Sequence, residues 1–187
     1  MEEDIRRCLE VLKKGGTILY PTDTIWGIGC DATNPKAVEK IYRIKKRMES
    51  KSLIILVEDA ERLKRHTGEI PEIAWDLLGN VDTPLTVIYP EARNLAKNVI
   101  APDGSIAIRI VSSPFCRDLI KKFGNPIVST SANISGQSSP TMFKHISEEI
   151  KNSVDYVVGI QQNELHEMKP STIARLKPDG EFEIVRK

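Results

Sequence analysis

A cluster of cations could bind phosphate groups. Lys45, Lys46 and Arg47 are adjacent, and Lys51 follows four residues after Arg47. Arginine offers a planar fork of donors and lysine a mobile point charge, a combination that suits a polyphosphate. Cations are also common at the solvated end of a helix, where they favour the helix dipole. The local sequence by itself favours this second interpretation.

A polar run at residues 129–139 reads Ser-Thr-Ser-Ala-Asn-Ile-Ser-Gly-Gln-Ser-Ser and follows an apolar segment at 126–128. The segment has the composition of a buried strand, so the run presents hydroxyls and an amide at a strand's end. Ligands bind at such ends in open α/β sheets. A serine-rich turn is the alternative. The residue types fit a site that binds phosphate or ribose and an ordinary turn equally well.

The segment 21–29, Pro-Thr-Asp-Thr-Ile-Trp-Gly-Ile-Gly, combines two hydroxyls, a carboxylate, an aromatic ring and two glycines. These are also ordinary turn residues, and the local sequence favours a turn. The glycine spacing is not that of a dinucleotide-binding loop. A further candidate is Arg109, at the end of an alternating strand at 105–109. It is either a solubility device on an edge strand or a buried clamp for a ligand, and the sequence does not decide between them.

Several common active sites are excluded because the sequence lacks their motifs. The chain has no GxxxxGK[ST] loop and no GxSxG, so it is neither a P-loop NTPase nor a typical serine hydrolase. The histidines lie in charged contexts and are expected on the surface: His66, His145 and His166. The cysteines have no metal-ligand spacing and are expected to be free thiols: Cys8, Cys30 and Cys116. We expect no protein metal site.

The elements that would position these residues alternate irregularly along the chain. Helices are predicted near residues 4–14, 35–45, 58–66, 71–79, 113–123 and 142–151. Strands are predicted at 17–20, 53–57, 85–89, 105–110, 126–130, 154–158, 171–176 and 182–186. Successive strands near the end lack an intervening helix, so a strict βαβ repeat is excluded. The pattern predicts an α/β (α+β) fold with a twisted, mostly mixed sheet and packed helices.

Size and charge suit one domain spanning residues 1–187. A chain of 187 residues can enclose one substantial core, and its formal net charge is only +1. Nucleic-acid binding would therefore need a local basic patch. The acidic start of the chain is not a signal peptide, and the apolar run at 53–57 is too short to span a bilayer. We expect a cytoplasmic protein that does not enter a membrane.

Together, five motifs in order resemble the YrdC-like family, whose members make threonylcarbamoyl-adenylate for the tRNA modification t6A. The family's PT[DE]T-x-[YW]G-x-G motif is similar to residues 21–29, and S-T-[IV] is similar to 171–173. The remaining matches are a KxR motif at Lys45 and Arg47, an SxN motif at Ser131 and Asn133, and a strand arginine at Arg109. The resemblance covers nearly the whole chain in its short, single-domain form.

This resemblance implies a role for each matched position. The predicted catalytic residues are Lys45, Arg47, Ser131 and Asn133. The predicted ATP contacts are Arg47, Lys51, Ser105, Ser131, Ser139 and Arg186, and the predicted threonine contacts are Thr24, Arg109, Ser129 and Ser171. The implied fold surrounds a concave basic cavity. The implied substrates are ATP, L-threonine and bicarbonate, with Mg²⁺ accompanying the nucleotide and t6A transferase proteins acting downstream.

The chain departs from the family pattern at three positions. Met48 and Ser52 replace prolines, and Leu56 replaces a histidine that longer members use toward threonine. These changes leave open a catalytically divergent member that binds nucleotides, double-stranded RNA or tRNA on its basic cavity. A carbamoyl-transfer role, as in hydrogenase maturation proteins, is a third alternative. It normally requires acylphosphatase-like and zinc-finger modules, which this sequence lacks.

Overall fold

Nine strands form one mixed sheet in a computed structural model that describes residues 1–46, 53–79, 83–163, 170–177 and 179–186. The strand order is β7-β1-β2-β6-β3-β5-β4-β8-β9. Neighbours β1/β7, β3/β5 and β4/β8 are parallel, and the other pairs are antiparallel. The bounds are β1 (Ile18–Tyr20), β2 (Gly27–Gly29), β3 (Ile54–Val57), β4 (Leu85–Tyr89), β5 (Ile106–Ile110), β6 (Ile127–Ser131), β7 (Tyr156–Val157), β8 (Thr172–Leu176) and β9 (Phe182–Arg186). The predicted twisted mixed sheet with packed helices is confirmed.

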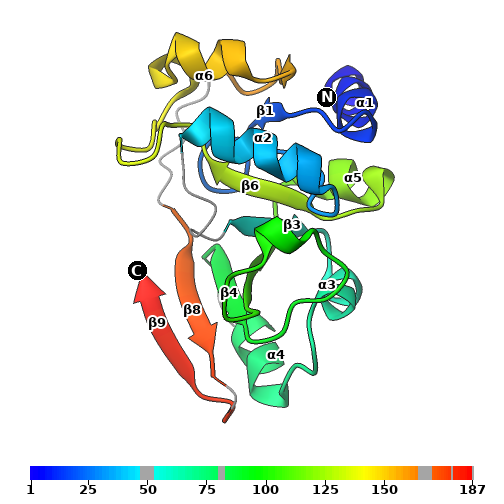
Figure 1. Ribbon diagram of the computed structural model, residues 1–187, viewed down its shortest axis with the longest axis vertical. Helices are drawn as coiled ribbons and strands as arrows, with labels where there is room; N and C mark the ends of the chain where they lie inside the picture. Colours follow the sequence, from blue (N-terminus) through cyan, green and yellow to red (C-terminus); the bar gives the residue numbers. More distant parts are fainter. Residues whose placement is uncertain (47–52, 80–82, 164–169, 178, 187) are drawn as a thin grey trace.

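Helices cover this sheet, with α1, α2, α5 and α6 in one half of the molecule and α3 and α4 in the other (Figure 1). Their bounds are α1 (Glu2–Lys13), α2 (Pro35–Lys45), α3 (Ala60–His66), α4 (Glu72–Gly79), α5 (Pro114–Phe123) and α6 (Glu148–Ser153), with short 3-10 helices η1 (Lys97–Val99) and η2 (Phe143–His145). None of the helices among the described residues has the length and hydrophobicity needed to cross a bilayer.

Helix α2 forms as its sequence predicts and carries the predicted site residue Lys45 at its end. The Asn34 side chain accepts hydrogen bonds from two backbone amides of the first turn, and Pro35 occupies the first helical position. One face of the helix is buried through Val38, Ile41, Tyr42 and Lys45. The helix ends at Lys45, and the capping residue Lys46 adopts a left-handed conformation with φ 49°. This helix therefore directs Lys45 inward and Lys46 outward.

The structure adds β2 and η1 to the predicted elements and divides the helix predicted at 142–151. Strand β2 was not predicted, because glycine has low strand propensity. A Cβ at Gly29 would lie only 2.6 Å from the Val128 carbonyl oxygen, so the strand approaches β6 too closely for a larger residue. The helix predicted at 142–151 is instead η2 followed by α6, because Ile146 has extended backbone (ψ 128°). Ser147 then caps α6 by accepting from the Ile150 amide.

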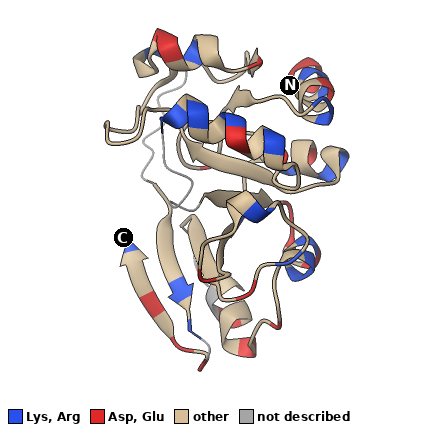
Figure 2. Ribbon diagram, viewed as in Figure 1, with Lys and Arg blue, Asp and Glu red and all other residues tan. Residues whose placement is uncertain are grey.

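The outside of the fold carries both signs of charge. Figure 2 shows acidic residues interspersed with basic ones along α1 and α2. Exposed ion pairs between residues one helical turn apart, such as Arg43 with Glu39, account for part of this pattern. Inside the fold, the three cysteines are free, as predicted, and all three are buried. Burial raises the pKa of Cys8 and of Cys116 to about 12, so both thiols stay protonated and unreactive at neutral pH.

The surface position predicted for His66 is wrong. The last turn of α3 packs its imidazole inside, 5% exposed, with Nδ1 3.3 Å from the Arg93 carbonyl oxygen. Burial lowers its pKa, and the nearby Arg62 charge acts in the same direction. His145 is exposed, as predicted, and His166 lies outside the described residues.

We expect His66 to make the protein sensitive to acid. Its pKa is lower in the folded state, so the unfolded chain binds the proton first as the pH falls below 6.5. The contribution of His66 to stability is thus complete above that pH. It decreases as the pH falls toward the folded pKa, by at most about 1.4 kcal/mol per pH unit. Urea unfolding of wild type and His66→Gln between pH 5 and 7 measures this. If the free energy of unfolding changed with pH by the same slope in both proteins, the expectation would be contradicted.

Candidate functional site

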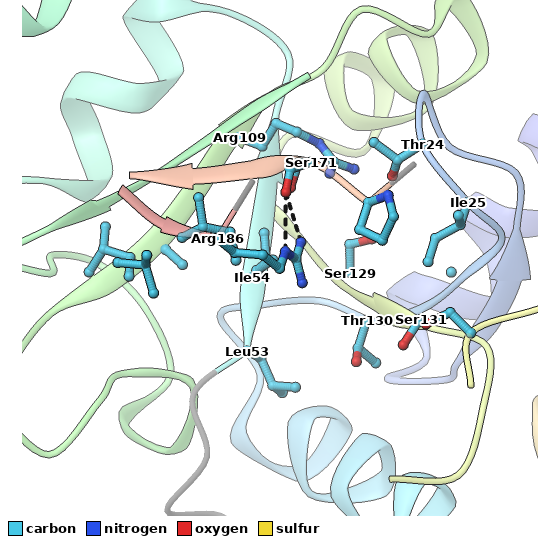
Figure 3. A pocket seen from close by; sticks show the side chains of 17 residues that line it. Thr24, Ile25, Leu53, Ile54, Arg109, Ser129, Thr130, Ser131, Ser171 and Arg186 are labelled. Atoms are coloured by element: carbon cyan, nitrogen blue, oxygen red, sulfur yellow. Dashed lines mark hydrogen bonds between the residues drawn. The ribbon is translucent and has the colours of Figure 1, made fainter. Parts of the chain in front are cut away.

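A pocket of about 260 Å³ opens where the ends of several strands meet, and we call it the central pocket. Its wall includes residues of β2, β3, β4, β5, β6, β8 and β9, and of the loop before β2. Figure 3 shows Arg109, Thr24 and Ser171 toward one end of this view, and Thr130, Ser131 and Leu53 toward the other. The charged residues that line it are Arg109 and Arg186; no carboxylate does so among the described residues. Its chemistry therefore suits an anion.

A buried ion pair holds Arg109. Its Nη2 lies 3.0 Å from Asp23 Oδ1, and the two side chains are 5% and 6% exposed. The other carboxylate oxygen, Oδ2, accepts from the Ser112 amide at 3.2 Å and from its hydroxyl at 3.3 Å. The Arg109 Nε has no hydrogen-bond partner among the described residues. The guanidinium is thus anchored on one side and keeps donor capacity for a ligand.

Two threonines in the loop before β2 meet beside this pair. The Thr22 hydroxyl donates to the Ile25 carbonyl at 2.7 Å and lies 3.0 Å from the Thr24 hydroxyl. It also accepts from the Thr24 amide at 3.1 Å. Thr24 lines the central pocket, whereas Thr22 lies behind it. The loop therefore turns one hydroxyl toward a ligand and uses the other for its own support.

The residue before β8 and the last residue of β9 contribute Ser171 and Arg186 to the pocket wall. The Ser171 hydroxyl lies 2.8 Å from that of Thr86, and its carbonyl accepts from Arg186 Nη2 at 2.9 Å and from Nε at 3.3 Å (Figure 3). Partial burial lowers the pKa of Arg186, and the positive charge of Arg109 contributes. An anion between the two guanidinium groups would relieve this repulsion. The geometry thus favours a carboxylate or phosphate there.

The side chain of Lys45 supports the polar run rather than lining the pocket. Its Nζ donates to the Ser131 carbonyl at 2.6 Å and to Asn133 Oδ1 at 2.9 Å, and Lys45 is 1% exposed. Ser131 Oγ also donates to Asn133 Oδ1, and Asn133 Nδ2 donates to the Gln137 carbonyl, both at 2.5 Å. Lys45 and Asn133 together hold residues 131–137 in shape. Of these residues, Ser131 faces the central pocket.

Most of the predicted site residues that the structure describes meet at the central pocket. The lining includes Thr24, Arg109, Ser129 and Ser171 from the predicted threonine contacts, and Ser131, Ser139 and Arg186 from the predicted ATP contacts. Ser105 instead lines a neighbouring pocket that shares Ile88 and Ala107 with the central one. Its hydroxyl donates to Asp103 at 2.6 Å. Lys45 and Asn133 act one layer behind the wall. The role of each residue stays a prediction.

Several predictions lie outside the described residues: Arg47, Lys51, Met48 and Ser52. The third departure from the family pattern, Leu56, is described and is fully buried in β3, in register with Arg109 of β5. It faces the same side of the sheet as Arg109, because paired residues on neighbouring strands share a face. The described residues hold no group of three or more His, Cys, Asp or Glu side chains that could bind a metal ion.

Sequence reasoning missed the supporting residues Asp23 and Thr22. Both stand in the segment 21–29, which was selected for its residue types, but turn residues of this kind gave no indication of their partners. Asp23 and Arg109 are 86 positions apart, and a single sequence does not report that contact. Gly27 has a related role, since a Cβ there would lie 3.1 Å from Ser129 Oγ. A larger residue would crowd the pocket wall.

Comparison with known proteins gives consistent matches. The family model Sua5_yciO_yrdC, described as telomere recombination, matches residues 10–187. A protein of Methanocaldococcus jannaschii is 36% identical over 183 residues, covering 95% of this chain and 84% of that protein. A threonylcarbamoyl-AMP synthase of Saccharophagus degradans is 34% identical over 158 residues, covering 83% of each chain.

The fold also matches solved structures. The crystal structure of P. abyssi Sua5 complexed with L-threonine has a TM-score of 0.86 and 29% sequence identity, and the match covers 94% of this chain. It covers 52% of that chain, so the present sequence spans about half the length of this structural relative. The similarity therefore extends over the part of the molecule that contains the central pocket.

Proposed function

The chain belongs to the Sua5/YciO/YrdC family, and on that premise we propose that it is a threonylcarbamoyl-AMP synthase. It would join L-threonine, bicarbonate and ATP and release pyrophosphate. The observation that carries this proposal is the gathering of Arg109, Arg186 and a set of hydroxyls around one pocket without a lining carboxylate. Such a wall suits two anionic substrates that also carry hydrogen-bonding groups.

The amino acid would occupy the end of the pocket near Arg109. A guanidinium binds a carboxylate with two parallel hydrogen bonds, and Arg109 is held for this by Asp23. Thr24, Ser129 and Ser171 lie around the same end and offer hydroxyls to the amine and side chain. The P. abyssi relative was crystallised in complex with L-threonine, which supports threonine as the amino acid that this chain would bind.

The nucleotide would contact Ser131, Ser139 and Arg186, which line the same pocket. The hydroxyls can donate to phosphate or ribose oxygens, and Arg186 supplies positive charge. Lys45 would act indirectly, by keeping Ser131 in place. We expect Arg47 and Lys51 to add phosphate contacts. Mg²⁺ would accompany the phosphates with water as its other ligands, since the pocket lining supplies no carboxylate.

The chemistry needs alignment more than covalent help. The threonine amine captures carbon dioxide from bicarbonate, and an oxygen of the resulting carbamate attacks the α-phosphorus of ATP. A new P–O bond forms as the bond to pyrophosphate breaks. The pocket would hold the two reactants in line, and its arginines would stabilise the charge on the phosphates. A shielded pocket would also protect the carbamate and the adenylate from water.

The direct test is the substrate dependence of pyrophosphate release. We expect release from ATP only when L-threonine and bicarbonate are both present, together with a product of the mass of threonylcarbamoyl-AMP. Omitting either substrate is the control. Pyrophosphate at an equal rate without threonine, or none with all substrates present, would contradict the proposed activity.

The proposed product would pass to the t6A transferase proteins, because a mixed anhydride of this kind is short-lived in water.

The alternative of a divergent member that binds double-stranded RNA or tRNA has less support in the described residues, where α1 and α2 mix both charges (Figure 2). A backbone-binding protein would lose affinity steeply with added salt. Titrating RNA at two salt concentrations beside the pyrophosphate assay separates the two functions.

A further inference from the structure

The hydrogen bonds of Thr22 fix the direction of the hydrogen bond that Thr24 makes. A threonine hydroxyl has one proton to donate and two lone pairs that accept. A carbonyl oxygen only accepts, so the Thr22 proton must point at the Ile25 carbonyl, 2.7 Å away. Thr22 therefore cannot donate to Thr24. In the 3.0 Å contact between the two hydroxyls, Thr24 must be the donor.

With this assignment, the proton and both lone pairs of the Thr22 hydroxyl take part in hydrogen bonds. Its proton is used by Ile25, and its lone pairs accept from the Thr24 amide at 3.1 Å and from the Thr24 hydroxyl. The Thr24 proton points away from the pocket, toward Thr22. Among the described residues, no other hydrogen bond is made by the Thr24 hydroxyl, so its lone pairs are left for a ligand.

The central pocket consequently presents an acceptor at Thr24 and a donor at Arg109. Thr24 and Thr22 are each 4% exposed, so bulk water does not compete freely for these bonds. The neighbouring hydroxyl of Ser171 has no such fixed direction, because its contact with Thr86 can run either way. A buried acceptor without a donor is unfavourable, so a ligand lacking a donor at this point would bind poorly.

We propose that Thr22 is a positioning residue that holds Thr24 as an obligatory acceptor, and that this acceptor selects an amino acid with a hydroxyl on its β-carbon. The inference rests on the proposed function. The substrate nitrogen is the other available donor, but it falls from three protons in the ammonium form to one in the carbamate. The β-hydroxyl keeps its proton throughout the reaction, so it can satisfy Thr24 in every step.

The first measurement uses wild-type protein and compares L-threonine with L-2-aminobutyrate, which lacks the hydroxyl, and with O-methyl-L-threonine, which retains the oxygen without its proton. We expect kcat/KM to fall by roughly tenfold or more for both analogues. Turnover of L-2-aminobutyrate within threefold of threonine would overturn the inference without any variant. A wild type inactive with threonine would instead overturn the proposed function.

The second measurement compares Thr22→Val, which removes the acceptor with little change of shape, with Thr22→Ser, which retains the hydroxyl. In Thr22→Val the Thr24 hydroxyl is free to turn and donate to the ether oxygen of O-methyl-L-threonine. We therefore expect the preference for threonine over this analogue to narrow by roughly tenfold, and Thr22→Ser to retain the wild-type ratio. The extra methyl group of the analogue is the same in all three proteins and cancels in the ratio.

Thermal unfolding of each variant shows whether it is folded before the ratios are compared. A general loss of structure lowers turnover of threonine and of its analogue alike, so it does not change the ratio. An unchanged ratio in folded Thr22→Val, or the same narrowing in Thr22→Ser, would overturn the positioning role. If Thr22→Val does not fold, the wild-type comparison still decides whether a substrate donor is required.

Discussion

Arg109→Met is expected to lower kcat/KM for threonine by about a hundredfold, because the variant loses charge-assisted hydrogen bonds worth roughly 3 kcal/mol to the substrate carboxylate. The arginine lines the pocket, and its neighbour Asp23 already holds it in place. The loss should appear mainly in the threonine KM, with a smaller change in the ATP KM. Pyrophosphate release at varied threonine and fixed ATP measures both.

The same substitution should destabilise the fold, because it leaves Asp23 without its cation in a site where its side chain is 6% exposed. Breaking a buried pair by removing one partner costs about 3–5 kcal/mol. Adding Asp23→Asn to Arg109→Met removes the uncompensated charge and should recover part of this stability but none of the activity. Recovery of threonine turnover in the double variant would show that Arg109 does not bind the carboxylate.

Local patterns predicted the elements well. The asparagine and proline at 34–35 and the inner face of α2 followed helix-capping and periodicity rules. Strand β2 could not be predicted in the same way. Its sequence, Gly-Ile-Gly, forms a strand because β1 and β6 lie close on both sides and no larger residue fits at Gly29. Tertiary contact overrides propensity there.

The site shows the same limit. The residue types at 21–29 and 129–139 identified the right segments, and the structure brings Thr24, Ser129 and Ser131 to one pocket. A single sequence could not show which way each hydroxyl side chain faces. Whether a hydroxyl lines the pocket, like that of Thr24, or supports it from behind, like that of Thr22, depends on contacts that form only in the fold.

Lys45 illustrates why residue type alone does not give a role. A lysine near phosphate-binding residues suggests direct contact with the nucleotide, and the family resemblance predicts a catalytic role for it. Its ammonium nevertheless donates to the Ser131 carbonyl and to Asn133, from a position that is 1% exposed. Lys45 is therefore placed to act on the reaction through Ser131.

Lys45→Met is expected to impair both stability and the use of ATP. The loss of hydrogen bonds from a charged group should lower the free energy of unfolding by about 2–3 kcal/mol. Residues 131–137 would then lose a support, and a displacement of Ser131 by about 1 Å can lower turnover by roughly a hundredfold. Urea unfolding and pyrophosphate release at varied ATP measure the two effects.

Lys46→Met is the matched control, because Lys46 is the next residue and its exposed ammonium pairs with Glu149 at the surface, 2.7 Å away. Such pairs contribute only about 0–1 kcal/mol, so this variant should retain nearly full stability and activity. If Lys45→Met also retained its ATP kinetics, Ser131 would not depend on the ammonium. If instead Lys45→Met lost turnover without any loss of stability, direct contact of Lys45 with the substrate would be the better explanation.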